Sequence, residues 1–158
     1  MLRWRRLKSI NGVTEMRRGF TLVELVVIVL VLGILAGVAT PKFFSTAALA
    51  TDNGLRQTLT QIRKAIELHA ANTRGAFPPC TGSGADFQAA LDPYLRGLFP
   101  KCPVGPAKNA NVIPASGSST PGAASPADGW KFNTDDGTFI CNFASPSESD
   151  PSISYDAF

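Results

Sequence analysis

The sequence predicts an α+β fold in which one long N-terminal helix, membrane-spanning in its first half, packs on a small antiparallel β-sheet. Two observations favour this fold. An apolar run over residues 20–39 is followed by a stripe of apolar residues at helical spacing, with no proline between residues 42 and 73. Alternating apolar residues, which are typical of strands, follow at 130–143. The 158 residues leave room for one small domain after the helix.

The apolar run is long enough to cross a bilayer. Between Phe20 and Ala39 only Thr21 and Glu24 are polar, and at ~1.5 Å of rise per residue the run matches a hydrocarbon core of ~30 Å. Residues 1–19 carry six Lys or Arg and one acid. The positive-inside rule therefore places the N-terminus in the cytoplasm, residues 20–40 in the membrane and the remainder on the exported side.

Glu24 is the unexpected residue in this run. A charged carboxylate in a spanning helix costs about 2.5–3.5 kcal/mol on insertion scales, and no Lys, Arg or His follows before Lys42. Cleavage between Gly19 and Phe20 would create a positive amino group near Glu24, in the same chain or in a neighbouring copy. The alternative is a carboxylate at the membrane edge that is protonated or reaches towards water.

The motif GFTLVEL at residues 19–25 resembles the prepilin signature of type IV pilins and type II secretion pseudopilins. The resemblance implies that an inner-membrane prepilin peptidase cuts after Gly19 and methylates the amino group of Phe20, and that Glu24 helps subunits join a filament. Residues 1–19 are then the leader if translation starts at Met1, and a start at Met16 would leave a four-residue leader. Pro41 matches the proline that the family places after the apolar segment, and we expect a helix kink there.

Beyond the span, residues 41–74 are predicted to form the amphipathic, periplasmic half of the helix, which ends at Gly75 before two prolines. Its apolar face should pack on the small domain, and the only histidine lies on this face, where packing is favoured over a ligand role. The basic and acidic residues off the stripe are predicted to be solvated. The stripe consists of Leu55, Leu59, Ile62, Ile66 and His69, and the solvated set of Arg56, Arg63, Lys64 and Glu67.

Residues 75–158 are predicted to form the small globular head. A short helix or turn segment is expected over 86–98, and a hairpin with Asp-Gly at its turn over 130–143. Residues 103–128 are predicted to be a flexible loop, because eighteen of these twenty-six residues are Pro, Gly, Ser or Ala. The segment YLRGLFPKCPVG before that loop is similar to the connection that pseudopilins place between helix and sheet.

Three cysteines follow the span, on the side where an oxidising compartment permits disulfides. We predict a disulfide between Cys80 and Cys102, with Cys141 as a buried thiol among core aromatics; a bond between Cys102 and Cys141 stays open. Without a CxxC pair, and with a single histidine, a zinc site is not expected.

The sequence contains no constellation for catalysis and implies no cofactor, so we expect a protein that is not an enzyme. Some pseudopilins bind calcium in C-terminal loops, but no twelve-residue calcium loop is present and turn or surface roles explain the acids here, so no metal site is predicted. After the leader, nine basic residues face eleven acids, which argues against nucleic-acid binding. The acids considered are Asp128, Asp135, Asp136, Glu148, Asp150 and Asp156.

These features predict a structural subunit of a periplasmic pseudopilus that drives export by a type II secretion system. Its expected partners are the prepilin peptidase, other pseudopilins, an inner-membrane assembly platform and lipid. A type IV pilin or a DNA-uptake pseudopilin is the near alternative. A secreted binding module or small enzyme is the distant one, in which Ala48-Leu49-Ala50 ends a cleaved signal peptide.

Overall fold

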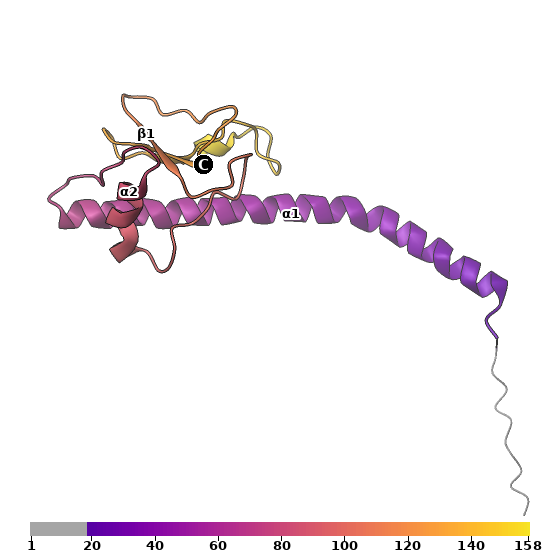
Figure 1. Cartoon of the computed structure of the whole chain (residues 1–158). Coiled ribbons are helices and arrows are strands. Elements are labelled where there is room, and N and C mark those ends of the chain that lie inside the picture. The colour runs from indigo at the N-terminus through magenta and orange to yellow at the C-terminus, as the bar shows by residue number, and fades with distance from the viewer. Residues whose placement is uncertain (1–18) are drawn as a thin grey trace, which may run out of the picture. The chain divides into compact units, whose positions relative to one another are not determined.

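The computed structural model describes residues 19–158, so the leader, except for Gly19, lies outside the described residues. The chain divides into two compact units, one ending at Thr40 and one running from Pro41 to Phe158. Helix α1, Leu22–Asn72, extends through both (Figure 1). Its continuation past Pro41 agrees with the predicted long helix, whereas the predicted kink stays a prediction.

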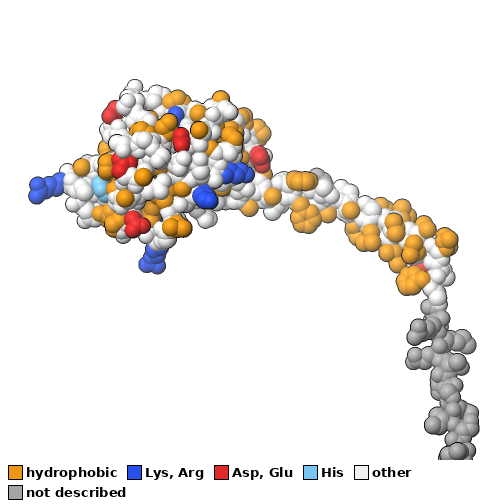
Figure 2. All heavy atoms as spheres, viewed as in Figure 1, with side chains coloured by type: hydrophobic (Ala, Val, Ile, Leu, Met, Phe, Trp, Pro, Cys, Tyr) orange, Lys and Arg blue, Asp and Glu red, His pale blue; other side chains and the backbone are white. Residues whose placement is uncertain are grey.

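In the first unit α1 exposes its apolar side chains on all sides. Every residue from Leu22 to Val38 is exposed, and hydrophobic side chains cover the surface of this part of the helix (Figure 2). A soluble helix would bury one face of such a sequence. This segment therefore presents an apolar surface that needs a lipid or protein environment.

In the second unit α1 buries one stripe and exposes the rest. The predicted apolar positions are confirmed, since the exposed fraction is 0% at Leu55, Leu59 and Ile62 and 3% at Ile66. Spacings of three and four residues bring these side chains onto a single face. Figure 1 shows the sheet beside this half of α1.

The sheet has three strands in the order β1-β2-β3: β1 is Val112–Ala115, β2 is Trp130–Asn133 and β3 is Phe139–Cys141. The predicted hairpin is confirmed, because β2 and β3 pair antiparallel with Trp130 opposite Cys141. The sheet as a whole is mixed rather than antiparallel, since β1 pairs parallel to β2. The α+β class holds with this correction.

Strand β1 lies inside the segment predicted to be a flexible loop, so that prediction is wrong for residues 112–115. Val112 is fully buried, and its N–H donates to the carbonyl of Ser83 at 3.0 Å. The amide of Gln88 donates to Ala110 O at 2.8 Å. Tertiary hydrogen bonds from flanking segments thus order a stretch whose composition alone gives no strand signal.

The segment between helix and sheet contains α2, Ala85–Leu91, followed by the 3-10 helix η1, Asp92–Tyr94; a second 3-10 helix, η2, spans Tyr155–Ala157 near the C-terminus. The short helix or turn segment expected over 86–98 is therefore confirmed as a short α-helix followed by a 3-10 turn, and Pro93 marks the end of the α-helical pattern. Phe87 of α2 stacks on Phe139 of β3 with 5.8 Å between ring centroids. This aromatic core lies between α2, the sheet and the stripe of α1.

Candidate functional site

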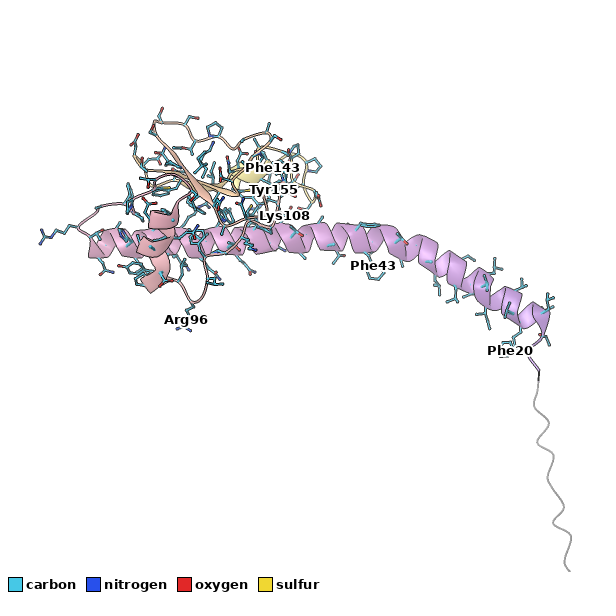
Figure 3. The ribbon with its side chains drawn as sticks, in the orientation of Figure 1. Phe20, Phe43, Arg96, Lys108, Phe143 and Tyr155 are labelled. Carbon is cyan, nitrogen blue, oxygen red and sulfur yellow. The ribbon has the colours of Figure 1, made fainter. Side chains whose placement is uncertain are left out.

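The predicted cleavage position lies just before α1 in an extended, accessible segment. Gly19 and Phe20 belong to no helix or strand and are both exposed, and Phe20 lies at the beginning of α1 (Figure 3). A Cβ added at Gly19 would meet no atom within 4 Å. Cleavage after Gly19 and methylation of Phe20 stay predictions, for which the local geometry leaves the backbone open.

Thr21 caps the helix that follows. Its Oγ1 accepts a hydrogen bond from the N–H of Glu24 at 3.2 Å, which satisfies one of the free donors at a helix N-terminus. The spacing Thr-x-x-Glu is that of a capping box. The Thr-x-x-Glu spacing is visible in the sequence, and it identifies Thr21 as a helix-capping residue that the sequence-based prediction did not name.

Glu24 is the one acidic residue on the exposed apolar part of α1. The helix contains a window of mean hydropathy 2.9 and is long and apolar enough to cross a membrane. Gly33 and Gly37 lie one turn apart in it, with open space around the position of an added Cβ. Small residues at this spacing permit close helix approach in lipid, so the segment combines a carboxylate with a surface on which another helix can pack.

The head is fastened to α1 by polar contacts from its C-terminal segment. Asp52 is buried, and one of its oxygens accepts hydrogen bonds from the hydroxyls of Ser147 and Ser149. Burial alone would raise the pKa of Asp52, but these bonds outweigh it and lower the pKa below 3.8. Asp52 lies three residues before Leu55 and therefore on the same buried face of α1. A carboxylate on an otherwise apolar helix face was the sequence signal for a buried polar contact.

Arg63 makes the second contact of this kind. Its guanidinium donates to the carbonyls of Phe139, at 3.0 and 3.1 Å, and Phe158, at 2.6 Å, and its burial lowers its pKa. The prediction that Arg63 is solvated is therefore wrong. Arg56, about two turns earlier on that face, lies 3.8 Å above the ring of Phe158. Both arginines hold the end of the chain on α1.

The cysteines are arranged differently from the predicted pairing. Cys102 and Cys141 bring their sulfurs to 3.4 Å, whereas the thiol of Cys80 faces the carbonyl of Val112 at 3.7 Å. The alternative partner, Cys141, thus occupies the place next to Cys102. Two features account for this. Cys141 on β3 pairs with Trp130 on β2, and the position of residue 102 is fixed by the hydrogen bond from its N–H to Asn109 O.

The three thiols also differ in acidity. The hydrogen bond from Cys141 lowers the pKa of Cys102, and the same bond, followed by burial, raises that of Cys141. Burial, followed by the charge of Asp86, raises the pKa of Cys80 to about 11. Because the thiolate is the reactive form, Cys102 is the thiol of this set best prepared to form a disulfide.

His69 packs rather than binds. Its ring meets Tyr94 edge-on with 6.0 Å between centroids, and its buried Nδ1 has no hydrogen-bond partner among residues 19–158. Three of the acids that could have served a metal accept hydrogen bonds from main-chain N–H groups instead: Asp135 from Gly117 N, Asp136 from Thr138 N and Asp156 from Gly122 N. Over the described residues no group of three His, Cys, Asp or Glu side chains could hold a metal ion.

Residues 16–40 match the family model of the prokaryotic N-terminal methylation motif. The chain is 28% identical, over 138 residues, to the type IV major fimbrial protein FimA of Dichelobacter nodosus; the match covers 80% of this chain and 88% of that protein. No solved structure matches the chain. With the motif at the head of a long helix that packs on a small sheet, these similarities support a relationship of the chain to the type IV pilin and pseudopilin family.

Proposed function

We propose that this protein is a structural subunit of a helical filament, stored in the inner membrane as a single-span precursor and assembled after cleavage between Gly19 and Phe20. The observation that carries the proposal is the apolar helical segment from Leu22 to Val38, in which every residue is exposed and Glu24 is the acidic one. An N-terminal apolar helix of this length and the methylation motif fit anchoring in the inner membrane. The head, residues 75–158, then lies in the periplasm.

The physical argument compares two environments for the same helix. In lipid the apolar side chains are satisfied, but Glu24 is costly. In a filament the helices of neighbouring copies replace the lipid, and the amino group of Phe20, created by cleavage, supplies a cation for the carboxylate. Assembly therefore relieves the cost of Glu24 without giving up apolar burial. The subunit needs a prepilin peptidase and an assembly platform but performs no chemistry of its own.

Two kinds of filament are candidates. The small head and the three-stranded sheet favour the pseudopilus of a type II secretion system, whose subunits carry compact heads. The similarity to a fimbrial major subunit along most of the chain favours a type IV pilus. We place the secretion pseudopilus first and the pilus second. Deletion of the gene separates them: loss of secreted proteins from the medium indicates a pseudopilus, and loss of surface fibres with normal secretion indicates a pilus.

The test of the filament role begins with the mature N-terminus. Mass spectrometry of the native protein should find a chain that begins at N-methylated Phe20, whereas a secreted module with a cleaved signal peptide would begin at Thr51. Gly19→Leu should accumulate as an uncleaved precursor in the membrane, because the peptidase must bring its backbone close to the scissile bond. Normal maturation of Gly19→Leu would remove the prepilin assignment.

Electron microscopy of cells that overproduce the wild-type chain is the second arm. Filaments that react with antibody against the head are expected. A processed chain that never forms filaments would show that maturation serves another purpose. Processing and polymerisation are thereby tested separately.

A further inference from the structure

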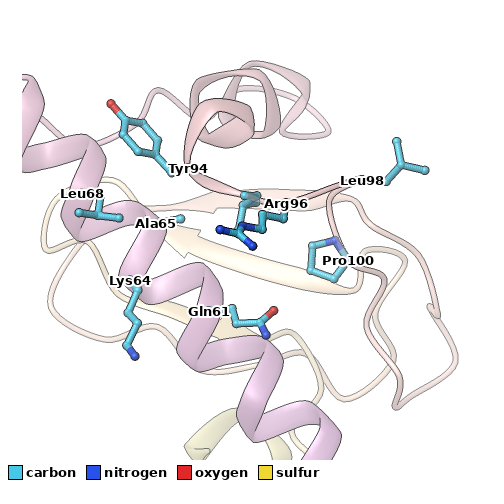
Figure 4. A pocket seen from close by; sticks show the side chains of 9 residues that line it. Gln61, Lys64, Ala65, Leu68, Tyr94, Arg96, Leu98 and Pro100 are labelled. Carbon is cyan, nitrogen blue, oxygen red and sulfur yellow. The ribbon is translucent and has the colours of Figure 1, made fainter.

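Leu98 is the most exposed large apolar side chain of the head. Its exposed fraction is 98%, and it points outward from the loop that follows η1, at the edge of a hollow lined by Gln61, Lys64 and Leu68 of α1 (Figure 4). Arg96, from the same loop, is exposed as well and projects from the head (Figure 3). The loop thus presents a leucine beside a positive charge.

This loop is held at both ends, so Leu98 is displayed on a fixed support. The N–H of Leu95 donates to Asp92 O at 3.4 Å, and the indole of the buried Trp130 donates to Pro100 O at 2.9 Å. Between them Gly97 has a φ of 95°, which other residues rarely adopt. A fixed loop loses little conformational entropy when its tip binds.

A complementary hollow lies elsewhere on the head. It has a volume of about 530 Å³, with apolar side chains that include Ile66, Phe77 and Phe139, and with Glu67 and Asp136 at its rim. Phe77 is 38% exposed. Arg63 also lines the hollow, but its guanidinium already donates to two main-chain carbonyls. An apolar floor with two acids suits a leucine with a neighbouring arginine.

The leucine loop and the hollow use different sides of α1. Ala65 and Leu68 lie beside the loop, and Arg63 and Ala70 line the hollow. Residues two apart on an α-helix point roughly 200° apart at 3.6 residues per turn, as 63 and 65 do, and also 68 and 70. One copy cannot bring its own Leu98 into its own hollow.

We propose that Leu98 of one copy of this chain docks in the hollow of the next copy, with Arg96 facing Glu67 and Asp136. The contact joins two different surfaces, so it can repeat head to tail from copy to copy, which is the kind of contact that an open filament requires. This inference rests on the proposed filament role. A single loop buries far less than the ~1,200 Å² of a stable free interface, and the contact therefore forms within an assembly rather than as a dimer in solution.

Cysteine crosslinking in membranes of cells that produce the full-length chain tests the contact. Two differently tagged copies carry Leu98→Cys and Thr138→Cys respectively; Thr138 is exposed and lines the hollow. Oxidation should link the two tags. Lys108→Cys in place of Thr138→Cys is the matched control, because it is exposed but lines a different hollow, and the wild-type chain gives the background of the three buried native cysteines.

Charge reversal provides the second measurement. Arg96→Glu in the copy that carries Leu98→Cys should reduce the Leu98–Thr138 crosslink to background, and adding Glu67→Arg to the copy that carries Thr138→Cys should restore it. Arg74→Glu, at an exposed arginine outside both surfaces, should leave the crosslink unchanged. Filaments without the crosslink would overturn the docking and leave the filament role intact. A crosslink without filaments would support the docking and overturn the filament role, and the absence of both would overturn both.

Discussion

Asp52 links the head to α1 through a carboxylate that is almost completely buried. Its exposed fraction is 3%, and its second oxygen, Oδ1, has no hydrogen-bond partner among residues 19–158. The hydroxyls of Ser147 and Ser149 both donate to Oδ2. Hydrogen bonds to a charged group are stronger than neutral ones, so this carboxylate fixes the loop before η2 in the charged state.

The first prediction is that Asp52→Asn destabilises the head by about 1–3 kcal/mol, because it removes the charge that strengthens the two serine hydrogen bonds and places a buried NH2 donor where Oδ1 has no partner. Thermal unfolding of the full-length chain in detergent measures the loss. Asp150→Asn is the matched control, since Asp150 is exposed and its carboxylate accepts from the nearby Ser152. Equal effects of the two substitutions would contradict the role of Asp52.

The pH dependence of this contact follows from the direction of the pKa shift. The pKa of Asp52 is lowered in the folded head from 3.8, so its contribution to stability is complete above that value and is lost as the pH falls through the lower folded pKa. Acid unfolding of the wild-type chain should therefore be steeper below pH 3.8 than that of Asp52→Asn. Parallel acid-unfolding curves for the two chains would show that Asp52 adds nothing.

The third prediction concerns the cysteines. On the oxidising side of a membrane, Cys102 and Cys141 should form a disulfide, because their sulfurs lie 3.4 Å apart and need a small approach to reach a bond length of about 2.05 Å. Peptide mapping without reduction should find this link and a free thiol at Cys80. A link between Cys80 and Cys102 would show instead that the loops rearrange on oxidation.

Among the elements, β1 depends on a neighbour rather than on its own sequence. Val112 receives its strand position from the carbonyl of Ser83 and from pairing with Trp130. Gly84, next to Ser83, has a φ of 76°, and a Cβ there would lie 2.6 Å from both Cβ and O of Val112. The turn before α2 therefore sets how closely β1 can approach.

The fourth prediction is that Gly84→Ala destabilises the head clearly more than Gly82→Ala. Both glycines have positive φ, so both substitutions incur backbone strain of about 1 kcal/mol. Only Gly84→Ala also forces Val112 away, whereas an added Cβ at Gly82 meets nothing within 4 Å. Thermal unfolding of both variants checks the difference. Equal losses would mean that β1 moves aside at no cost.

The elements that could be predicted are those whose signal is local. The stripe of α1 and the β2–β3 hairpin follow from periodicity and from turn residues, which one stretch of chain carries by itself. Strand β1 could not be predicted, since its four residues include a proline and lie among small residues, and their order comes from Ser83 and Trp130. The same holds for Arg63, whose acceptors lie 76 and 95 residues away.

The candidate site divides in the same way. Gly19, Phe20 and Glu24 lie within one short motif, so the sequence alone predicts them as site residues, and their roles stay predictions. The Cys102–Cys141 contact joins residues 39 positions apart and depends on the register of the sheet, for which the sequence offered two equal alternatives. Local motifs were predicted and long-range partners were not, because the latter depend on packing.

At the scale of the whole molecule, the chain combines an apolar helical segment that carries one carboxylate with a compact head. Among residues 19–158 no group of three His, Cys, Asp or Glu side chains could hold a metal ion. The helix is far too apolar on its exposed faces for water, as Leu22 at 80% and Val38 at 73% exposure illustrate. In lipid Glu24 is the costly residue of that segment. If the proposed filament role holds, the balance between membrane storage and assembly is expected to depend on this carboxylate.

The last prediction is that Glu24→Gln and Glu24→Val insert in the membrane and are cleaved after Gly19 normally, but fail to assemble into ordered filaments. The carboxylate costs about 2.5–3.5 kcal/mol in lipid, and the amino group of Phe20 from a neighbouring copy relieves that cost in the filament alone. An uncharged residue has no cost to relieve, so each added subunit loses this bias towards assembly.

Thr40→Val is the matched control. It also removes a polar group from the apolar segment, but the hydroxyl of Thr40 already donates a hydrogen bond to Ala36 O within the same helix. Mass spectrometry follows cleavage, and electron microscopy of filaments after overproduction follows assembly. Ordinary filaments from Glu24→Val would show that the carboxylate is incidental and that helix packing alone drives polymerisation.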